Sequence, residues 1–236
     1  MLIWLASFPR SGNTMIRVLL HKVYGRQSLS LYDERPGEDD PANVFAPIFR
    51  VCGSAGQAGP LDELRRRPDV CFVKTHGLPA DDSPAVYVVR DGRDALVSYA
   101  HFIRTYEPPE SHGASFDDLL AMLIGSTGHF GGWSGNVREW RARRAPTVWL
   151  RYEDLVRRPL ELLDEALDRL QTGVRRANHG TVDFDDLHAR WPDFFRQGKS
   201  GSWRQEMNPA LQRLFWEHHH EAMFACGYSR EATAAA

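Results

Sequence analysis

The chain has 236 residues, with 29 lysines and arginines against 31 aspartates and glutamates. This near balance of charge excludes a global attraction to nucleic acid or to an anionic membrane surface, so any site for an anion has to be local. The three cysteines are odd in number and widely spaced, which argues against both a disulfide framework and a structural zinc site.

The N-terminal run Leu2–Ala6 predicts a buried strand rather than a signal peptide, because no basic region precedes it and Pro9 and Arg10 interrupt it. No stretch of the sequence reaches the roughly 18 apolar residues of a membrane span. We therefore expect a cytoplasmic protein with no membrane partner. A chain of this length fits one α/β domain, and we expect residues 1–236 to form a single domain.

Predicted strands and helices alternate along the chain. Runs rich in Val, Ile and aromatic residues predict strands buried on both faces at Leu2–Ala6, Val70–Val73, Ala85–Val89 and Thr147–Leu150. Apolar spacing and capping residues predict helices at Thr14–Tyr24, Arg93–Ile103, Pro159–Leu170 and Pro209–Cys226. This alternation predicts an α/β fold of three layers, with a central parallel sheet flanked by helices.

Two stretches resist assignment to regular elements. Residues 26–68 are rich in Pro, Gly and Asp, and residues 106–135 carry paired prolines and several glycines. Both are long for structureless connections, so we predict that they are lids or acceptor-binding segments.

Basic or hydrogen-bonding residues follow each of the four predicted strands. The segments are Ser7–Thr14, Lys74–His76, Arg90–Arg93 and Arg151–Glu153. Ligands of open α/β sheets bind at the carboxyl ends of the strands. Four strand ends that all carry basic or hydrogen-bonding residues therefore indicate a binding site for an anionic ligand.

The segment after the first strand has the spacing of a phosphate-binding P-loop. Ser7 stands for the first glycine of that motif, Gly12 for the second and Thr14 for the hydroxyl. Asn13 occupies the position of the usual lysine, while Arg10 supplies a cation from inside the loop. We interpret the segment as a P-loop-like phosphate cradle; the alternative is an ordinary strand–turn–helix with a Ser or Asn cap.

Two further pairs of residues suit a reaction on an anion. Lys74 and His76 lie two apart on an extended chain and face the same way, so the lysine can hold an anionic group while the imidazole takes a proton. Arg90 and Ser98 flank a helix start and can share one phosphate, although Arg90 can instead pair with Asp91 or Asp94. The glycine-bearing basic loop 196–204 either closes on an anion or is a surface linker.

Taken in order, these segments resemble the sulfotransferases that depend on 3′-phosphoadenylyl sulfate (PAPS). Ser7–Thr14 resembles the family's 5′-phosphosulfate loop, and Val88–Ser98 its 3′-phosphate motif. Lys74–Pro79, Arg151–Leu155 and Arg196–Arg204 are similar to three further segments of that family. The resemblance implies transfer of a sulfuryl group from PAPS to a hydroxyl of a small-molecule acceptor such as a phenol, an alcohol or a secondary metabolite. It also implies release of adenosine 3′,5′-bisphosphate (PAP) and no metal.

The resemblance assigns roles to individual residues. His76 would be the general base, with Lys74 and Arg10 stabilising charge near the transferring group. The other residues implied in donor binding fall into three groups. The 5′-phosphate and the sulfate would be held by Arg10, Ser11, Gly12, Asn13 and Thr14. The 3′-phosphate would be held by Arg90, Ser98, Arg196 and Gly198, and Gln197 in the same loop would also contact the donor. The adenine would be contacted by Tyr152 and Phe184.

Some residues depart from the family pattern. Arg10 stands where many members have lysine, Met15 replaces a tryptophan and Gln197 replaces a lysine. The family's dimerisation pattern is altered over residues 204–213, so that a monomer and a homodimer both stay open.

Two other functions also stay open: a P-loop-type small-molecule kinase, which would need magnesium, and a catalytically silent nucleotide-binding protein. An aromatic acceptor pocket would draw on His101, Phe102, Tyr106 and Phe130; the alternative is that these residues belong to core or lid packing, and a carbohydrate or lipid alcohol also stays open as the acceptor.

Overall fold

The computed structural model describes residues 1–32, 61–111, 113, 115–177 and 200–230. Its centre is a five-stranded sheet with the order β2-β3-β1-β4-β5, in which all neighbouring strands are parallel. The strands are β1 (Leu2–Ser7), β2 (Ser28–Ser30), β3 (Cys71–Thr75), β4 (Ala85–Val89) and β5 (Thr147–Arg151). The predicted parallel sheet is confirmed, and β2 is an addition that the sequence did not indicate because it has only three residues.

Helices follow the strands along the chain. They are α1 (Asn13–Lys22), α3 (Leu61–Arg66), α4 (Gly92–Tyr106), α5 (Phe116–Gly125), α6 (Gly132–Ala142), α7 (Tyr152–Arg157), α8 (Pro159–Arg169), α10 (Trp203–Glu206) and α11 (Pro209–Ala225), with short 3-10 turns η2 (Pro109–Ser111) and η3 (His129–Gly131). The four predicted helices are present, with ends displaced by less than one turn. In the described ranges no helix combines the length and the apolar character needed to cross a membrane.

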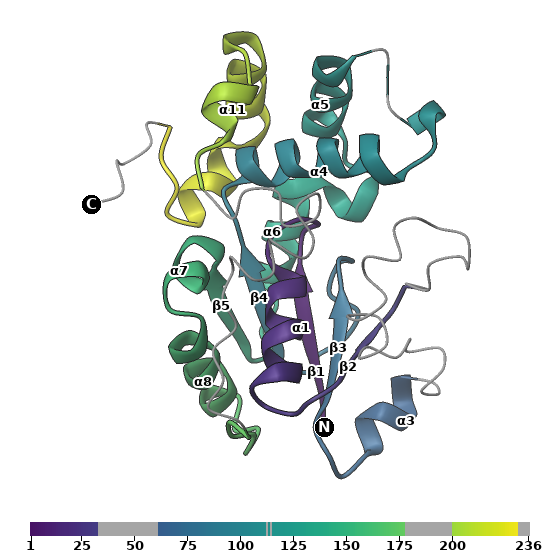
Figure 1. The fold of residues 1–236 in the computed structure, drawn as a ribbon, viewed down its shortest axis with the longest axis vertical. Coiled ribbons are helices and arrows are strands. Elements are labelled where there is room, and N and C mark those ends of the chain that lie inside the picture. Colours follow the sequence, from purple (N-terminus) through teal and green to yellow (C-terminus); the bar gives the residue numbers. More distant parts are fainter. Residues whose placement is uncertain (33–60, 112, 114, 178–199, 231–236) are drawn as a thin grey trace.

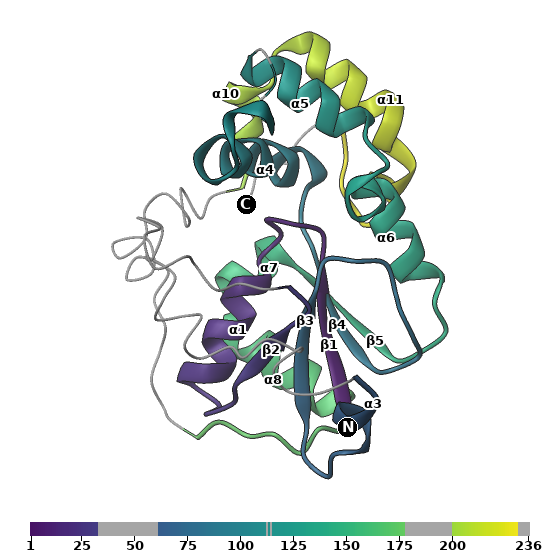
Figure 2. The ribbon, with the colours of Figure 1, turned by 90° about the vertical axis from the view of Figure 1, so that its right-hand side faces the viewer.

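The helices cover both faces of the sheet and its carboxyl edge. Ile3 and Leu5 pack with residues of α1, α7 and α8, whereas Leu2 and Trp4 pack on the opposite side with residues of α4, α6 and α11. Successive residues of one strand thus point into two separate apolar cores, which explains the continuous run without alternation. Figures 1 and 2 show α1 and α8 on one side of the sheet and α6 on the other, with α4, α5 and α11 above the strand ends.

The stretch 106–135 holds more regular structure than we expected from its composition. It contains α5 and the start of α6. Ser115 caps α5 by accepting a hydrogen bond from the N–H of Asp118, and the buried side of the helix packs against α4 and α11. That side consists of Leu119, Leu120, Leu123 and Ile124. The flanking prolines and glycines, which break helices, concealed a regular apolar period over these few turns.

Candidate active site

The loop between β1 and α1 offers polar groups at a helix start. Arg10 and Gly12 both have left-handed backbones, with φ 63° and φ 106°. The Asn13 side chain donates to the Leu5 carbonyl oxygen at 2.8 Å and so ties the start of α1 to β1. Ser11 Oγ and Asn13 Oδ1 are buried and have no hydrogen-bond partner within the described part of the chain. The Ser11 hydroxyl, which can donate a hydrogen bond, and the N-terminus of α1 suit an anionic ligand.

Gly12 lets a tyrosine from another strand end pack onto this loop. A Cβ added at Gly12 would lie 2.7 Å from Cδ2 of Tyr152, the first residue of α7. The Arg90 guanidinium lies 4.4 Å from the centroid of the same tyrosine ring and donates to the Arg10 carbonyl oxygen at 3.0 Å. Burial raises the pKa of Tyr152, so its phenol stays protonated at neutral pH. Three of the four predicted strand ends therefore meet at one place.

The Arg10 side chain points to α4. Its Nε donates to Ser98 Oγ at 3.3 Å, and its guanidinium lies 5.3 Å from the centroid of the Phe102 ring. The structure thus brings together Arg10 and Ser98, which the sequence assigned to opposite ends of the donor.

The carboxylates near Arg90 make hydrogen bonds of their own. Asp91 pairs with Arg93 at 2.6 Å. Asp94 accepts hydrogen bonds from the N–H groups of Gly201 at 2.6 Å and Trp203 at 3.1 Å. Burial raises the pKa of Asp94, an effect that the positive charge of Arg90 opposes. Asp94 thereby fixes the C-terminal part of the predicted basic loop 196–204.

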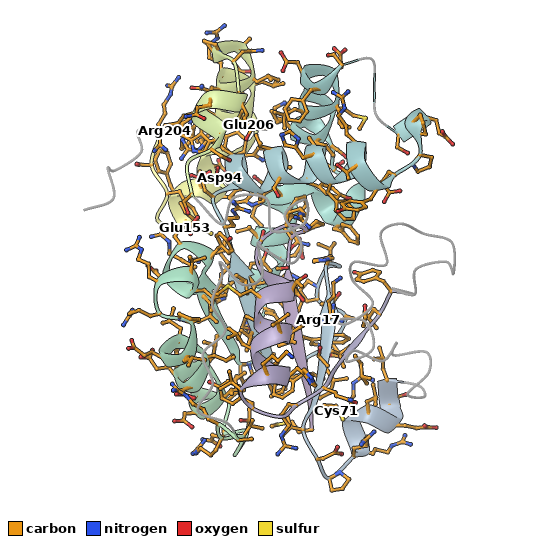
Figure 3. The ribbon with its side chains drawn as sticks, viewed as in Figure 1. Arg17, Cys71, Asp94, Glu153, Arg204 and Glu206 are labelled. Carbon is orange, nitrogen blue, oxygen red and sulfur yellow. The ribbon has the colours of Figure 1, made fainter. Side chains whose placement is uncertain are left out.

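Figure 3 places Asp94 near the start of α4, with Glu153 of α7 below it. Glu153 accepts hydrogen bonds from the N–H of Asp91 at 3.1 Å and from the hydroxyl of Tyr228 at 2.7 Å. Its own burial raises its pKa. Glu153 thus joins the β4 end, the β5 end and the C-terminal segment beneath the site.

His76 lies across from the loop and is held to it by a hydrogen bond. Its Nδ1 is 2.8 Å from the Ser7 carbonyl oxygen. A carbonyl can only accept, so Nδ1 carries the hydrogen, and in the neutral ring Nε2 then carries the lone pair. The Asn136 side chain donates to the His76 carbonyl oxygen at 2.8 Å, which holds the main chain as well. The side chain and the main chain of His76 are thus both held in place.

Aromatic rings surround the imidazole. Tyr32 stacks on His76 with ring centroids 5.8 Å apart, and Phe130 meets it edge-on at 5.7 Å. Lys74 Nζ lies 5.6 Å from the Tyr32 ring centroid, so both predicted basic residues touch this ring. The sequence missed Tyr32 as a site residue, although it falls in the segment 26–68 predicted to be near the acceptor. The sequence also did not indicate Asn136 as a site residue, because a single polar residue in an amphipathic helix is ordinary.

Several predicted residues do not join this group. His101 forms a hydrogen bond with the Glu206 carboxylate and packs on Phe116, so it links α4 to α10 and α5. Phe102 lies against Tyr106, with ring centroids 5.0 Å apart. Four further positions lie outside the described residues, and their roles stay predictions: Phe184, Arg196, Gln197 and Gly198.

A second histidine lies buried in the helical layer. His219 is buried, and its Nδ1 is 2.6 Å from Ser134 Oγ. Burial lowers the pKa of His219 to about 4. The described ranges contain no group of three or more His, Cys, Asp or Glu residues arranged to hold a metal ion. His219 therefore belongs to the packing of α6 against α11.

The chain is similar to sulfotransferases in sequence and in fold. It is 24% identical to bovine sulfotransferase 1A1 over 254 residues, which cover 94% of this chain and 83% of that protein. It is 24% identical to mouse sulfotransferase 1E1 over 256 residues, which cover 94% and 83%. Among solved structures, mouse SULT7A1 in complex with PAP superposes with a TM-score of 0.66 at 19% identity, covering 94% of this chain and 83% of the other.

A bacterial-type relative and a family model extend this likeness. The sulfotransferase domain of the curacin biosynthetic pathway superposes with a TM-score of 0.55 at 16% identity, covering 97% of this chain and 98% of that domain. The model of the sulfotransferase domain family matches residues 2–227, which is nearly the whole chain. The match includes every strand and every helix that the structure describes. The chain therefore belongs to the sulfotransferase domain family and is a PAPS-dependent sulfotransferase.

Proposed function

We propose that this enzyme binds PAPS between the β1–α1 loop, Arg90, Ser98 and Tyr152, and transfers its sulfuryl group to a hydroxyl that His76 deprotonates. The observation that carries the proposal is the hydrogen bond from His76 Nδ1 to the Ser7 carbonyl oxygen, at 2.8 Å. It joins the predicted base to the first residue of the predicted phosphosulfate loop. This hydrogen bond would hold the imidazole of His76 at a fixed distance from the donor site.

The residues of the loop fit a phosphosulfate. The Ser11 hydroxyl, the start of α1 and the cation of Arg10 all belong to this loop or directly follow it, and they can supply hydrogen bonds and positive charge to an anion. We assign the 3′-phosphate to Arg90, which lies over the Tyr152 ring, and to Ser98, which accepts a hydrogen bond from Arg10. The ring of Tyr152 would then contact the adenine. Structure neighbours of this fold were crystallised with PAP, including mouse SULT7A1 and retinol dehydratase.

The reaction that we propose is an in-line displacement. When PAPS is bound, its sulfur–oxygen bond to the 5′-phosphate breaks as the acceptor oxygen bonds to sulfur, and the acceptor proton passes to His76 Nε2. The Ser7 carbonyl keeps the imidazole in the tautomer that can take this proton. Lys74 and Arg10 stabilise the negative charge that develops on the leaving phosphate. Arg10 acts by charge alone, because a guanidinium with a pKa above about 12 does not give up a proton.

We further propose that the acceptor is a small molecule with a hydroxyl on an apolar body. Tyr32 and Phe130 offer aromatic surface on two sides of the imidazole. Leu78, two residues after His76 in the chain, is 44% exposed and lies against Gly131. Retinol dehydratase, at 21% identity, was crystallised with retinol, and in a second structure with androsterone. Both of those ligands are alcohols with a large apolar frame, and a phenol satisfies the same requirements.

The test is a sulfuryl-transfer assay with labelled PAPS and a panel of phenols and apolar alcohols. His76→Ala should lower turnover by roughly 10²–10⁴-fold and leave the affinity for PAP nearly unchanged, because the base acts on the acceptor and not on the donor. The matched control is His218→Ala, an exposed histidine of α11, which should leave both quantities unchanged. Equal losses of turnover and PAP affinity in His76→Ala would refute the role as base. Thermal stabilisation by magnesium-ATP but not by PAP would favour a P-loop kinase instead.

A further inference from the structure

Tyr32 reaches the His76 segment from the neighbouring strand. The edge strand β2 pairs with β3 in parallel, with Ser30 opposite Lys74. Two residues further along each strand come Tyr32 and His76. The N–H of Leu31 donates to the Lys74 carbonyl oxygen at 3.2 Å, and the N–H of Tyr32 donates to Ser30 Oγ at 3.1 Å. Strand pairing therefore brings the tyrosine to the base.

The hydroxyl of Tyr32 binds the main chain of the base. It accepts a hydrogen bond from the N–H of His76 at 2.8 Å and another from the N–H of Gly77 at 3.1 Å. The Gly77 N–H has a second acceptor, Thr75 Oγ1, at 3.0 Å. One phenolic oxygen thus holds the two peptide units that flank the His76 side chain. It complements Asn136, which holds the carbonyl of the same residue.

The ring of Tyr32 holds the plane of the imidazole. The two rings stack with an interplanar angle of 20°, and Lys74 Nζ lies over the tyrosine ring. The plane of an imidazole determines where its Nε2 lone pair points. A base has to come within about 2.6–3.2 Å of the proton it removes, and a shift of about 1 Å in a reacting group can cost 10²-fold in rate.

We propose that Tyr32 is a positioning residue for His76, which it fixes through hydrogen bonds to the main chain and through stacking on the ring. This inference rests on the proposed role of His76 as the base. Tyr32 acts through His76 and takes no part in the proton transfer itself. The phenol of Tyr32 is therefore required for turnover and dispensable for binding of the donor.

Tyr32→Phe tests this role, because it keeps the stacked ring and removes only the hydroxyl. We expect turnover to fall by about 10–100-fold, with the affinity for PAP and the KM for the acceptor within about twofold of wild type. The control is Tyr24→Phe, which removes a hydroxyl that donates to Asp164 at 2.7 Å away from the site. It should leave turnover unchanged. Rates are expressed per PAP-binding site, so that a smaller folded fraction does not count as lost catalysis.

Amide hydrogen exchange gives a second measurement that does not depend on activity. In Tyr32→Phe the His76 amide should exchange about tenfold faster, since a protecting hydrogen bond is lost. The Gly77 amide should change less, because Thr75 Oγ1 still accepts from it. Unchanged exchange at His76 would overturn the hydrogen bonds on which the inference depends.

A double-mutant cycle separates this inference from the proposed function. If Tyr32 acts only through His76, Tyr32→Phe should cause no further loss in a His76→Ala background. A full additional loss there would overturn the positioning role, as would wild-type turnover of Tyr32→Phe alone. Wild-type turnover of His76→Ala would instead overturn the role of His76 as base, and the positioning role with it.

Discussion

Replacement of Gly12 by alanine should damage the donor site through one added methyl group. The methyl would lie 2.7 Å from Tyr152 Cδ2 and 3.2 Å from Cε2, on a backbone with φ 106°. A non-glycine residue in such a conformation costs of the order of 1–3 kcal/mol. Relief of the clash requires the Tyr152 ring to move, and that ring is the one against which Arg90 lies. We therefore expect weaker PAP binding as well as lower stability.

The two effects can be measured together. For a chain of this size each kcal/mol lowers the melting temperature by about 2–4 °C. If the strain is relieved by displacing Tyr152 and Arg90, the dissociation constant for PAP should rise about tenfold or more, since 1.4 kcal/mol is about a factor of ten. Calorimetric titration with PAP and thermal unfolding measure both. The control is Gly135→Ala in α6, where an added Cβ meets nothing within 4 Å. That change should stabilise the protein by about 0.4–1 kcal/mol. Wild-type PAP affinity and melting temperature in Gly12→Ala would refute the reasoning.

Two further predictions concern buried groups. The pKa of His219 is lowered to about 4 from 6.5, so between these pH values the unfolded chain takes up a proton that the folded chain does not. Stability should therefore fall as the pH drops through this window, by up to about 3 kcal/mol. Urea titrations at pH 7 and pH 5 should show a smaller fall for His219→Gln, and an equal fall would contradict the assignment. Asp94→Ala should speed exchange of the Gly201 and Trp203 amides about tenfold, because both lose their acceptor; unchanged rates would count against Asp94 as the anchor of that segment.

The sequence predicted the parts of the fold that depend on local pattern. Continuous apolar runs identified four of the five strands, since burial on both faces leaves that signature along the chain. The sequence did not indicate β2, because three residues are too few to show a hydrophobic period. The position of β2 is determined by its pairing with β3. The sequence also missed α5, because helix-breaking residues on both sides outweighed a short apolar period.

The candidate site, like the fold, could be predicted only in part from the sequence. The strand ends that carry Arg10, Arg90 and Tyr152 were predictable, because a parallel sheet brings its carboxyl ends to one edge. The contact between Arg10 and Ser98 was not, since it depends on how α4 lies over the loop. The sequence did not indicate Tyr32 as a site residue for a similar reason. A hydrogen bond between a side-chain hydroxyl and a main-chain N–H leaves no sequence pattern, so the contact between Tyr32 and the His76 N–H could not be predicted.

The order of the strands has a consequence for how the enzyme is made. β1 is near the N-terminus and lies in the middle of the sheet, where its two partners are β3 and β4, with Leu2 opposite Cys71 and Trp4 opposite Ala85. During synthesis this apolar strand emerges before both of its partners, so its two edges stay exposed until β3 and β4 leave the ribosome. Such long-range pairing is slow, and an unpaired strand is prone to aggregate. Tyr152, which packs on the loop after β1, is made later still. The capacity to bind PAP would then arise among the last events of folding, and a nascent chain that stops before Tyr152 would lack it.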